Sequence, residues 1–317
     1  MTQQICILGG TGFIGRHLTR RLVALGHRVT ILTRRPERHR ALLLVPSVQL
    51  LQGDVFDPDF LDKQFDRVDT VINLIGILNA RDRKGDEFYR VHAQLPAIIA
   101  AACQRSSVGR LLHMSALNAD PDRGPSHYLR SKGTGEAAVH QTHSEHLRVT
   151  SFQPSVVFGA DDRFTILFAE LLRAIPVFFP LACSDAKFQP IHVDDVVTAF
   201  VNTLTDRRSY GQRYALCGPT RYSLYEIVHL IAELTETKRH IIRLTARQSR
   251  WQAALMEFVP GKPFSRDNFD SMAVDSICDG PLAAELGIVP RSLEEIAPAY
   301  LRPWVDTLSE LRRHARR

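Results

Sequence analysis

The fold of this chain is decided near its N-terminus, by the stretch Ile5-Cys6-Ile7-Leu8-Gly9-Gly10-Thr11-Gly12-Phe13-Ile14-Gly15. Its apolar start predicts a buried strand, and the residues after the last glycine have the spacing of an amphipathic helix. The glycines allow a sharp turn, close approach of the backbone to a pyrophosphate, and tight packing of helix on strand. Amide groups at a helix N-terminus also favour bound phosphate. We therefore expect a dinucleotide to be bound by Gly9, Gly10, Thr11, Gly12, Phe13, Ile14 and Gly15.

Apolar runs and helical patterns alternate through the first half of the chain. Strands are expected at residues 4–8, 28–33, 48–52, 69–75, 108–114 and 147–152. Helices are expected at about 13–25, 36–45, 58–65, 86–105 and 126–142. Such alternation with short connections predicts an α/β fold of the Rossmann type, a doubly wound parallel sheet with helices on both faces.

The regular alternation ends near residue 159, where an irregular segment rich in proline and phenylalanine begins. We expect a dinucleotide-binding domain of residues 1–159 plus about 190–217. Residues 160–189 and 218–317, approximately, are expected to form a smaller, mostly helical substrate lobe. Three apolar residues of this lobe stand in a proline-bounded loop, where they pack between lobes, line an apolar pocket or form a docking patch: Phe178, Phe179 and Leu181.

Composition limits the classes of protein to consider. No apolar run reaches the roughly 18 residues that span a bilayer, and the first strand begins too early for a signal or transit peptide. The net charge of +6 is concentrated at 33–40 and 311–317, but neither segment forms a nucleic-acid module, so no nucleic-acid partner is expected. An odd number of scattered cysteines predicts reduced thiols and a cytoplasmic location; they are Cys6, Cys103, Cys183, Cys217 and Cys278.

The end of the second strand indicates which cofactor is bound. An acidic residue at this point selects NAD, whereas arginine accommodates the 2′-phosphate of NADP. Here Thr33 is followed by Arg34 and Arg35, with no carboxylate. Guanidinium groups form charge-assisted, bidentate hydrogen bonds with phosphate. NADP(H) is therefore favoured over NAD(H), and the alternative is a solvated basic turn.

Further cofactor contacts are expected where the next strands end. Asp54, beside Val55, follows the third strand, where its carboxylate accepts from an adenine amino group or caps a helix. Leu74, Ile75 and Gly76 follow the fourth strand, where a small residue lets the backbone approach a ribose.

Tyr128 and Lys132 are the candidate catalytic residues. Four positions apart on a predicted helix, they share a face. A phenol has an ordinary pKa near 10, and a nearby ammonium favours its ionised form, so the pair predicts a general acid or base. The same lysine is placed to hold the nicotinamide ribose. The alternative is an aromatic anchor beside a surface lysine.

Taken together, these motifs resemble the extended branch of the short-chain dehydrogenase/reductase superfamily. The resemblance implies that Tyr128 transfers a proton with Lys132 as its partner, and that Pro154 and Val156 lie at the cofactor. It also implies a hydroxyl residue after the fifth strand, where Ala116 stands and Ser115 is the nearest candidate. The segments that carry the resemblance are 9–15, 53–54, 128–132, 153–159 and 191–196. The chain departs from the family pattern at His92, where the family usually has asparagine.

Within this branch the chain is similar to the subgroup of the nucleotide-binding accessory subunit of respiratory complex I. That likeness is carried by 113–119, 128–136, 158–164 and 189–190. It implies a retained nucleotide, a small-molecule or quinone-related substrate, and peripheral contact with a membrane respiratory complex at the inner face of the membrane.

Three hypotheses follow. The first is an NADP(H)-dependent oxidoreductase acting on a carbonyl or hydroxyl through Tyr128 and Lys132. The alternative is a catalytically silent, NADPH-bound scaffold or assembly factor, and a redox-sensing regulator is the third. No metal is expected, because histidines three residues apart drift around a helix and lack cysteine partners; these are His140, His143 and His146.

Overall fold

The computed structural model describes residues 2–82, 84–259, 262–280 and 282–302 of the chain. Seven strands form one parallel sheet in the order β11-β6-β5-β4-β1-β2-β3. The reversal of order at β1 and β4 confirms the expected doubly wound, Rossmann-type α/β fold. The strands are β1 (Gln4–Leu8), β2 (Arg28–Thr33), β3 (Val48–Gln52), β4 (Thr70–Asn73), β5 (Arg110–Met114), β6 (Arg148–Pro154) and β11 (Arg213–Leu216).

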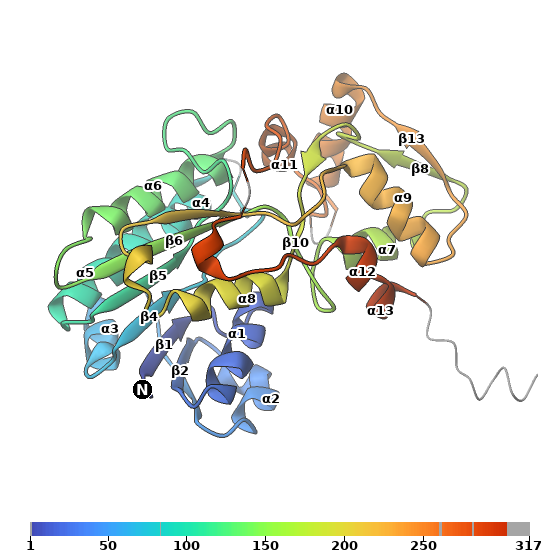
Figure 1. Cartoon of the computed structure of the whole chain (residues 1–317). Helices are drawn as coiled ribbons and strands as arrows, with labels where there is room; N and C mark the ends of the chain where they lie inside the picture. Colours follow the sequence, from blue (N-terminus) through green and yellow to red (C-terminus); the bar gives the residue numbers. More distant parts are fainter. Residues whose placement is uncertain (1, 83, 260–261, 281, 303–317) are drawn as a thin grey trace, which may run out of the picture.

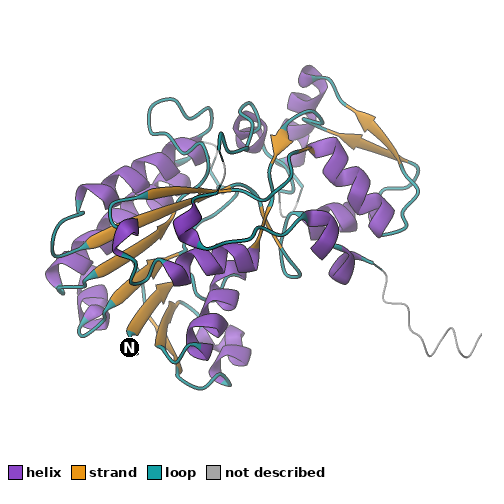
Figure 2. Cartoon of the chain, in the orientation of Figure 1, coloured by secondary structure: helices purple, strands orange, loops and turns teal. Residues whose placement is uncertain are grey.

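Helices cover both faces of this sheet (Figure 2). One face packs against α1 (Phe13–Ala24) and α8 (Val193–Asn202). The other packs against α3 (Pro58–Phe65), α5 (Leu95–Arg105) and α6 (His127–Gln141). Because both faces are buried, the central strands read as continuous apolar runs instead of alternating. Shorter elements connect these helices and strands: η1 (Pro36–His39), α2 (Arg40–Leu43), α4 (Asp86–Tyr89), η2 (Arg90–Gln94) and η3 (Arg207–Ser209).

A second group of elements lies to one side of the sheet and has its own apolar core (Figure 1). Phe179 and Leu181 are buried in that core, whereas Phe178 is 57% exposed. The expected packing between lobes is therefore not what the structure shows: these two residues lie on a strand, β8, inside the core of the second group itself. The elements are α7 (Thr165–Ala174), β8 (Phe178–Leu181), α9 (Leu224–Leu234), β13 (His240–Arg243), α10 (Ala246–Met256), α11 (Arg266–Ser271), α12 (Leu293–Ile296) and α13 (Pro298–Leu301). Between α11 and α12, η4 (Ala284–Leu286) returns to the sheet domain and packs against α8.

Short strand pairs join the two groups of elements. β7 (Val157–Phe158) pairs in parallel with β10 (Ile191–His192). β9 (Lys187–Phe188) pairs in antiparallel fashion with β12 (Tyr222–Ser223). These pairs lie where the chain leaves and re-enters the sheet domain. Among the residues that the structure describes, no helix has the length and apolar content needed to cross a bilayer.

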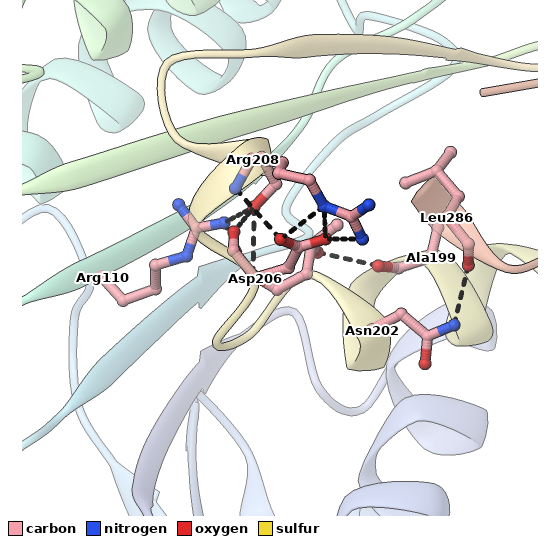
Figure 3. A network of polar contacts seen from close by, with 8 residues as sticks. Arg110, Ala199, Asn202, Asp206, Arg208 and Leu286 are labelled. Atoms are coloured by element: carbon pink, nitrogen blue, oxygen red, sulfur yellow. Dashed lines mark hydrogen bonds and ion pairs between the residues drawn. The ribbon is translucent and has the colours of Figure 1, made fainter. Parts of the chain in front are cut away.

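A buried arginine stabilises the end of the sheet at which β5 begins (Figure 3). Arg110, at the start of β5, donates to the carbonyl oxygens of Arg148 and Thr203 and to the hydroxyl of Ser209. Burial lowers its pKa to about 10, so it remains charged at neutral pH. Nearby, Asn202 donates to the carbonyl of Leu286 and fastens the C-terminal segment to α8. These bonds hold β5, whose carboxyl end carries part of the candidate site.

The expectation that all five cysteines are reduced thiols is wrong for one pair. Cys217, just after β11, forms a disulfide with Cys278 in the C-terminal segment, with 6.1 Å between their Cα atoms. The other three cysteines are free. Because 61 residues separate the bonded pair, local spacing carried no sign of it. The odd number of scattered cysteines therefore does not support the expected location in a reducing compartment.

Candidate nucleotide and active site

The glycine turn between β1 and α1 forms a backbone cradle. Gly9 has a φ of +82°, and a Cβ built on it would lie 2.9 Å from the carbonyl carbon of Leu74. A Cβ on Gly15 would clash with the Gly9 carbonyl oxygen. Gly12 donates its amide to that same oxygen at 3.0 Å and is the N-cap of α1, without a capping side chain. The glycines therefore let the turn pack closely on itself and on the β4 loop, and the start of α1, which no side chain caps, offers its amides to a phosphate.

The other residues of the turn hold its position. A Cβ on Gly10 would lie 2.9 Å from the Ile31 side chain, and Ile14 packs against the core. The carbonyl of Thr11 accepts from Arg16, whose guanidinium also pairs with Asp161 at 3.0 Å. The Phe13 ring lies beside Gly159. The turn is thus fastened to the loop that follows β7.

The end of β2 lies beside this turn, because β2 is the neighbour of β1 in the sheet. Thr33 is buried, and its hydroxyl accepts from the amide of Arg35 at 3.4 Å. Arg34 and Arg35 have exposed side chains. Two guanidinium groups are therefore available to solvent at the carboxyl edge of the sheet.

Side chains at the carboxyl ends of β3 and β4 form hydrogen bonds with the loops that follow. Asp54 accepts from the amide of Phe56 at 3.0 Å and is exposed, while Asp57 caps α3. Val55 is buried in the core. Asp54 thus closes a local turn, and the helix-cap alternative belongs to Asp57. After β4, the amide of Ile75 is held by the Asn73 side chain at 3.1 Å.

Lys132 reaches the end of β4 from α6. It is buried, and its Nζ donates to the carbonyl of Met114 at 3.1 Å. A Cβ on Gly76 would lie 3.2 Å from that Nζ, so the structure brings together two residues that the sequence predicted separately. Burial lowers the pKa of Lys132 to about 8.

Tyr128 lies one turn earlier on α6, partly exposed and packed against the rings of Phe88 and His92. Burial of its phenol, together with the charge of Asp267, raises its pKa to about 12. The expected lowering of this pKa by the lysine ammonium is not found in this structure, where burial and the Asp267 carboxylate raise it. The phenol keeps its proton at neutral pH.

Asp267 is a site residue that the sequence analysis missed. Its two carboxylate oxygens accept from the amides of His127 at 2.8 Å and Tyr128 at 3.2 Å, at the N-terminus of α6. A carboxylate there is favoured by the helix dipole, although burial raises its pKa. More than a hundred residues separate Asp267 from α6, and nothing in its local sequence indicated the contact.

His92 belongs to a π-helical turn that interrupts the helix expected over 86–105. Its Nε2 accepts from the amide of Ile77 at 2.9 Å, so the proton lies on Nδ1, which faces the Ser131 hydroxyl at 3.1 Å. That hydroxyl donates to the carbonyl of Tyr128. Burial and nearby Lys132 lower the pKa of His92 to about 2. A neutral histidine therefore connects the β4 loop to the tyrosine.

The Ser115 hydroxyl is bound to a buried carboxylate within the fold. It donates to a carboxylate oxygen of buried Glu136 at 3.0 Å, and burial raises the pKa of Glu136. Downstream, the carbonyls of Pro154 and Val156 accept from the amides of Leu117 and Ile191. Because the Ser115 hydroxyl is bound to Glu136, the mechanism proposed below gives no step to Ser115.

Comparison with known proteins agrees with this geometry. A model of the NAD dependent epimerase/dehydratase family matches residues 5–217. The chain belongs to this family. Membership supports an NAD(P)-dependent protein of oxidoreductase or epimerase-like type, which is consistent with the extended short-chain dehydrogenase/reductase resemblance of the sequence.

Curated relatives are similar over most of the chain. A mouse mitochondrial protein, NADH dehydrogenase (ubiquinone) 1 alpha subcomplex subunit 9, is 30% identical over 321 residues, covering 97% of this chain and 79% of the relative. A ceramide reductase of Caulobacter vibrioides is 32% identical over 255 residues, covering 76% and 73%.

Solved structures support the fold alone. The structure of Pal from Bacillus thuringiensis matches with a TM-score of 0.74 at 18% identity, covering 96% of this chain and 99% of that one. The UDP-glucose 4-epimerase of Thermotoga maritima matches with a TM-score of 0.72 at 17% identity, with the same coverage.

Proposed function

We propose that this protein is an NADP(H)-dependent oxidoreductase that reduces a carbonyl group. The observation that carries the proposal is the position of the pair: Tyr128 and Lys132 lie one turn apart on α6, and Lys132 reaches Gly76 in the loop that Gly9 contacts. A raised pKa keeps the phenol protonated at neutral pH but makes it a weaker acid, so proton donation relies on Lys132 to stabilise the phenolate. Reduction of a carbonyl needs such a donor, whereas oxidation of an alcohol needs the phenolate as a base.

Different residues at the carboxyl edge of the sheet bind the cofactor and transfer the proton. Amides at the start of α1 hold the pyrophosphate, and Arg34 and Arg35 hold the 2′-phosphate of NADP(H). When bound, the nicotinamide ring supplies a hydride to the carbonyl carbon. Tyr128 donates its phenolic proton to the carbonyl oxygen, and Lys132, charged below a pH of about 8, stabilises the phenolate that remains and donates to the ribose.

The substrate is proposed to be an apolar carbonyl compound, of lipid or quinone-related type. The name of the Caulobacter relative specifies reduction of a lipid, ceramide. The test is NADPH oxidation with long-chain ketones and quinone precursors, compared with short polar ketones. Oxidation of NADPH by polar ketones alone would contradict this substrate class.

Preference for NADP(H) is tested by replacing both exposed arginines. In an Arg34→Ala/Arg35→Ala variant we expect the Kd for NADPH to rise about 10- to 100-fold, because hydrogen bonds to charged groups contribute about 1.5–3 kcal/mol. The Kd for NADH should change little. Calorimetric titration with both nucleotides measures this, and Arg38→Ala, nearby and exposed, is the control. Equal weakening of both nucleotides would show that these arginines do not select the phosphate.

The role of Asp267 is tested by its pH effect. In Asp267→Asn the carboxylate charge is lost, so the pKa of Tyr128 should fall from about 12 toward its usual value near 10. The titration profile of the phenol should therefore move to lower pH. Ultraviolet titration, with Tyr128→Phe as the blank, follows the phenol directly. Asp270→Asn, on the same helix, should leave the profile in place, and an unchanged profile in Asp267→Asn would remove this role.

A second candidate function is favoured by one feature of the site. The Ser115 hydroxyl is bound by Glu136, and Ala116 offers no hydroxyl. The candidate is a catalytically silent, NADPH-bound accessory subunit in peripheral contact with a membrane respiratory complex; the name of the mouse relative specifies a subunit of NADH dehydrogenase (ubiquinone). Purified protein should then retain NADPH without turnover and recover respiratory subunits on affinity capture.

A further inference from the structure

Helix α10 turns its apolar side chains outward. Trp251 and Leu255, one turn apart, are each 65% exposed, and Phe258, just past the helix, is 75% exposed. On the inward face, Ser249 and Ala253 are buried. An ordinary surface helix has the opposite arrangement, with its apolar stripe against the core.

Hydrogen bonds fix this orientation. The hydroxyl of Ser249 accepts from the amide of Cys183 at 3.1 Å. Gln252 donates from Nε2 to the carbonyl of Pro180 at 3.0 Å. A capping box between Thr245 and Gln248 closes the N-terminus of the helix. The polar face is therefore anchored to the segment around β8, and the apolar row faces away from the protein.

Positive charge surrounds the apolar row. Arg247 precedes Trp251 by one turn on the same face, and Arg250 lies on its flank; both are exposed. Residues 246–256 contain no aspartate or glutamate. Apolar and cationic side chains together, with a tryptophan among them, match the boundary between acyl chains and anionic headgroups. A protein partner with an apolar groove would not need the flanking charge.

We propose that the outward face of α10 docks on the surface of an anionic phospholipid bilayer, with Trp251 and Leu255 inserted at the interface. In the fold, α10 packs against α11, which contacts α6 through Asp267 (Figure 1). Docking therefore brings the bilayer near the elements that carry Tyr128. Docking through α10 does not depend on carbonyl reduction, because an enzyme and a silent accessory protein would dock in the same way.

Co-sedimentation of the full chain with vesicles tests the docking. Wild type should bind vesicles of phosphatidylcholine with phosphatidylglycerol, and bind pure phosphatidylcholine more weakly. Trp251→Ser/Leu255→Ser should bind the anionic vesicles roughly tenfold more weakly, equivalent to about 1.4 kcal/mol. Arg247→Gln/Arg250→Gln should lose the preference for anionic lipid. The control is Leu43→Ser/Leu44→Ser, two exposed apolar residues on the sheet domain, which should bind like wild type.

Tryptophan fluorescence reports the insertion itself. With Trp304→Phe, Trp251 is the remaining tryptophan of the chain. Its emission should shift to shorter wavelength with anionic vesicles and be quenched by brominated acyl chains. Unchanged NADPH affinity and thermal unfolding show that each variant is folded. The basic segment 311–317 is present in every variant, so binding that survives Trp251→Ser/Leu255→Ser would assign the attraction to other charges and overturn the proposal. Absence of wild-type binding, or self-association through Trp251 without lipid binding, would also overturn it.

Discussion

Replacing Tyr128 with phenylalanine is expected to lower NADPH-dependent carbonyl reduction about 10²- to 10⁴-fold, the usual contribution of a positioned acid. Phenylalanine keeps the ring that packs against Phe88 and His92 but has no proton to donate. Since the substitution removes only the hydroxyl and leaves the glycine turn and Lys132 in place, the Kd for NADPH should change little. A fall in kcat with an unchanged nucleotide Kd is the signature of a proton donor.

Steady-state NADPH oxidation and calorimetric titration measure these two quantities. Tyr89→Phe is the matched control, because Tyr89 loses the same hydroxyl at a partly buried position whose ring contacts His127 instead. Equal turnover in wild type and Tyr128→Phe would exclude Tyr128 from the mechanism. Retained NADPH with no turnover in either protein would favour the silent accessory function.

Substituting Gly15 with alanine is expected to weaken NADPH binding by about 10²-fold or more and to lower stability by about 1–3 kcal/mol. The added Cβ would clash with the Gly9 carbonyl oxygen and lie 2.6 Å from the Gly10 Cα. These are backbone atoms, so they relax only by moving the turn, and overpacking costs of this size follow. A displaced turn also loses hydrogen bonds to charged phosphate, each of which contributes about 1.5–3 kcal/mol.

Gly280→Ala is the control for this substitution, since a Cβ there would meet nothing within 4 Å. Calorimetry gives the nucleotide Kd, and thermal unfolding gives the stability change. If Gly15→Ala binds NADPH as tightly as Gly280→Ala does, the nucleotide does not rest on this turn. Reduced stability with normal binding would show that the glycine serves packing alone.

Much of the fold was predictable because its signals are local. The helix expected over 126–142 is α6, with Ser126 accepting from the Leu129 amide at its start. The strand expected over 147–152 is β6, extended to Pro154. The expectation of an irregular segment after residue 159 was wrong, since α7 and β8 lie there. The helix expected over 86–105 is interrupted by the π-helical turn at Arg90–Gln94. There the carbonyl of His92 meets Gly135, whose missing side chain permits the close approach.

The sequence by itself determined the glycine turn, the parallel sheet and the shared face of Tyr128 and Lys132, because each depends on spacing within a few residues. Only the tertiary structure decided the raised pKa of Tyr128, the binding of Ser115 by Glu136 and the Cys217–Cys278 disulfide. Each of these depends on groups that are distant in sequence or on burial. Desolvation and through-space charge act over a few ångströms, and the fold determines which groups come within that range.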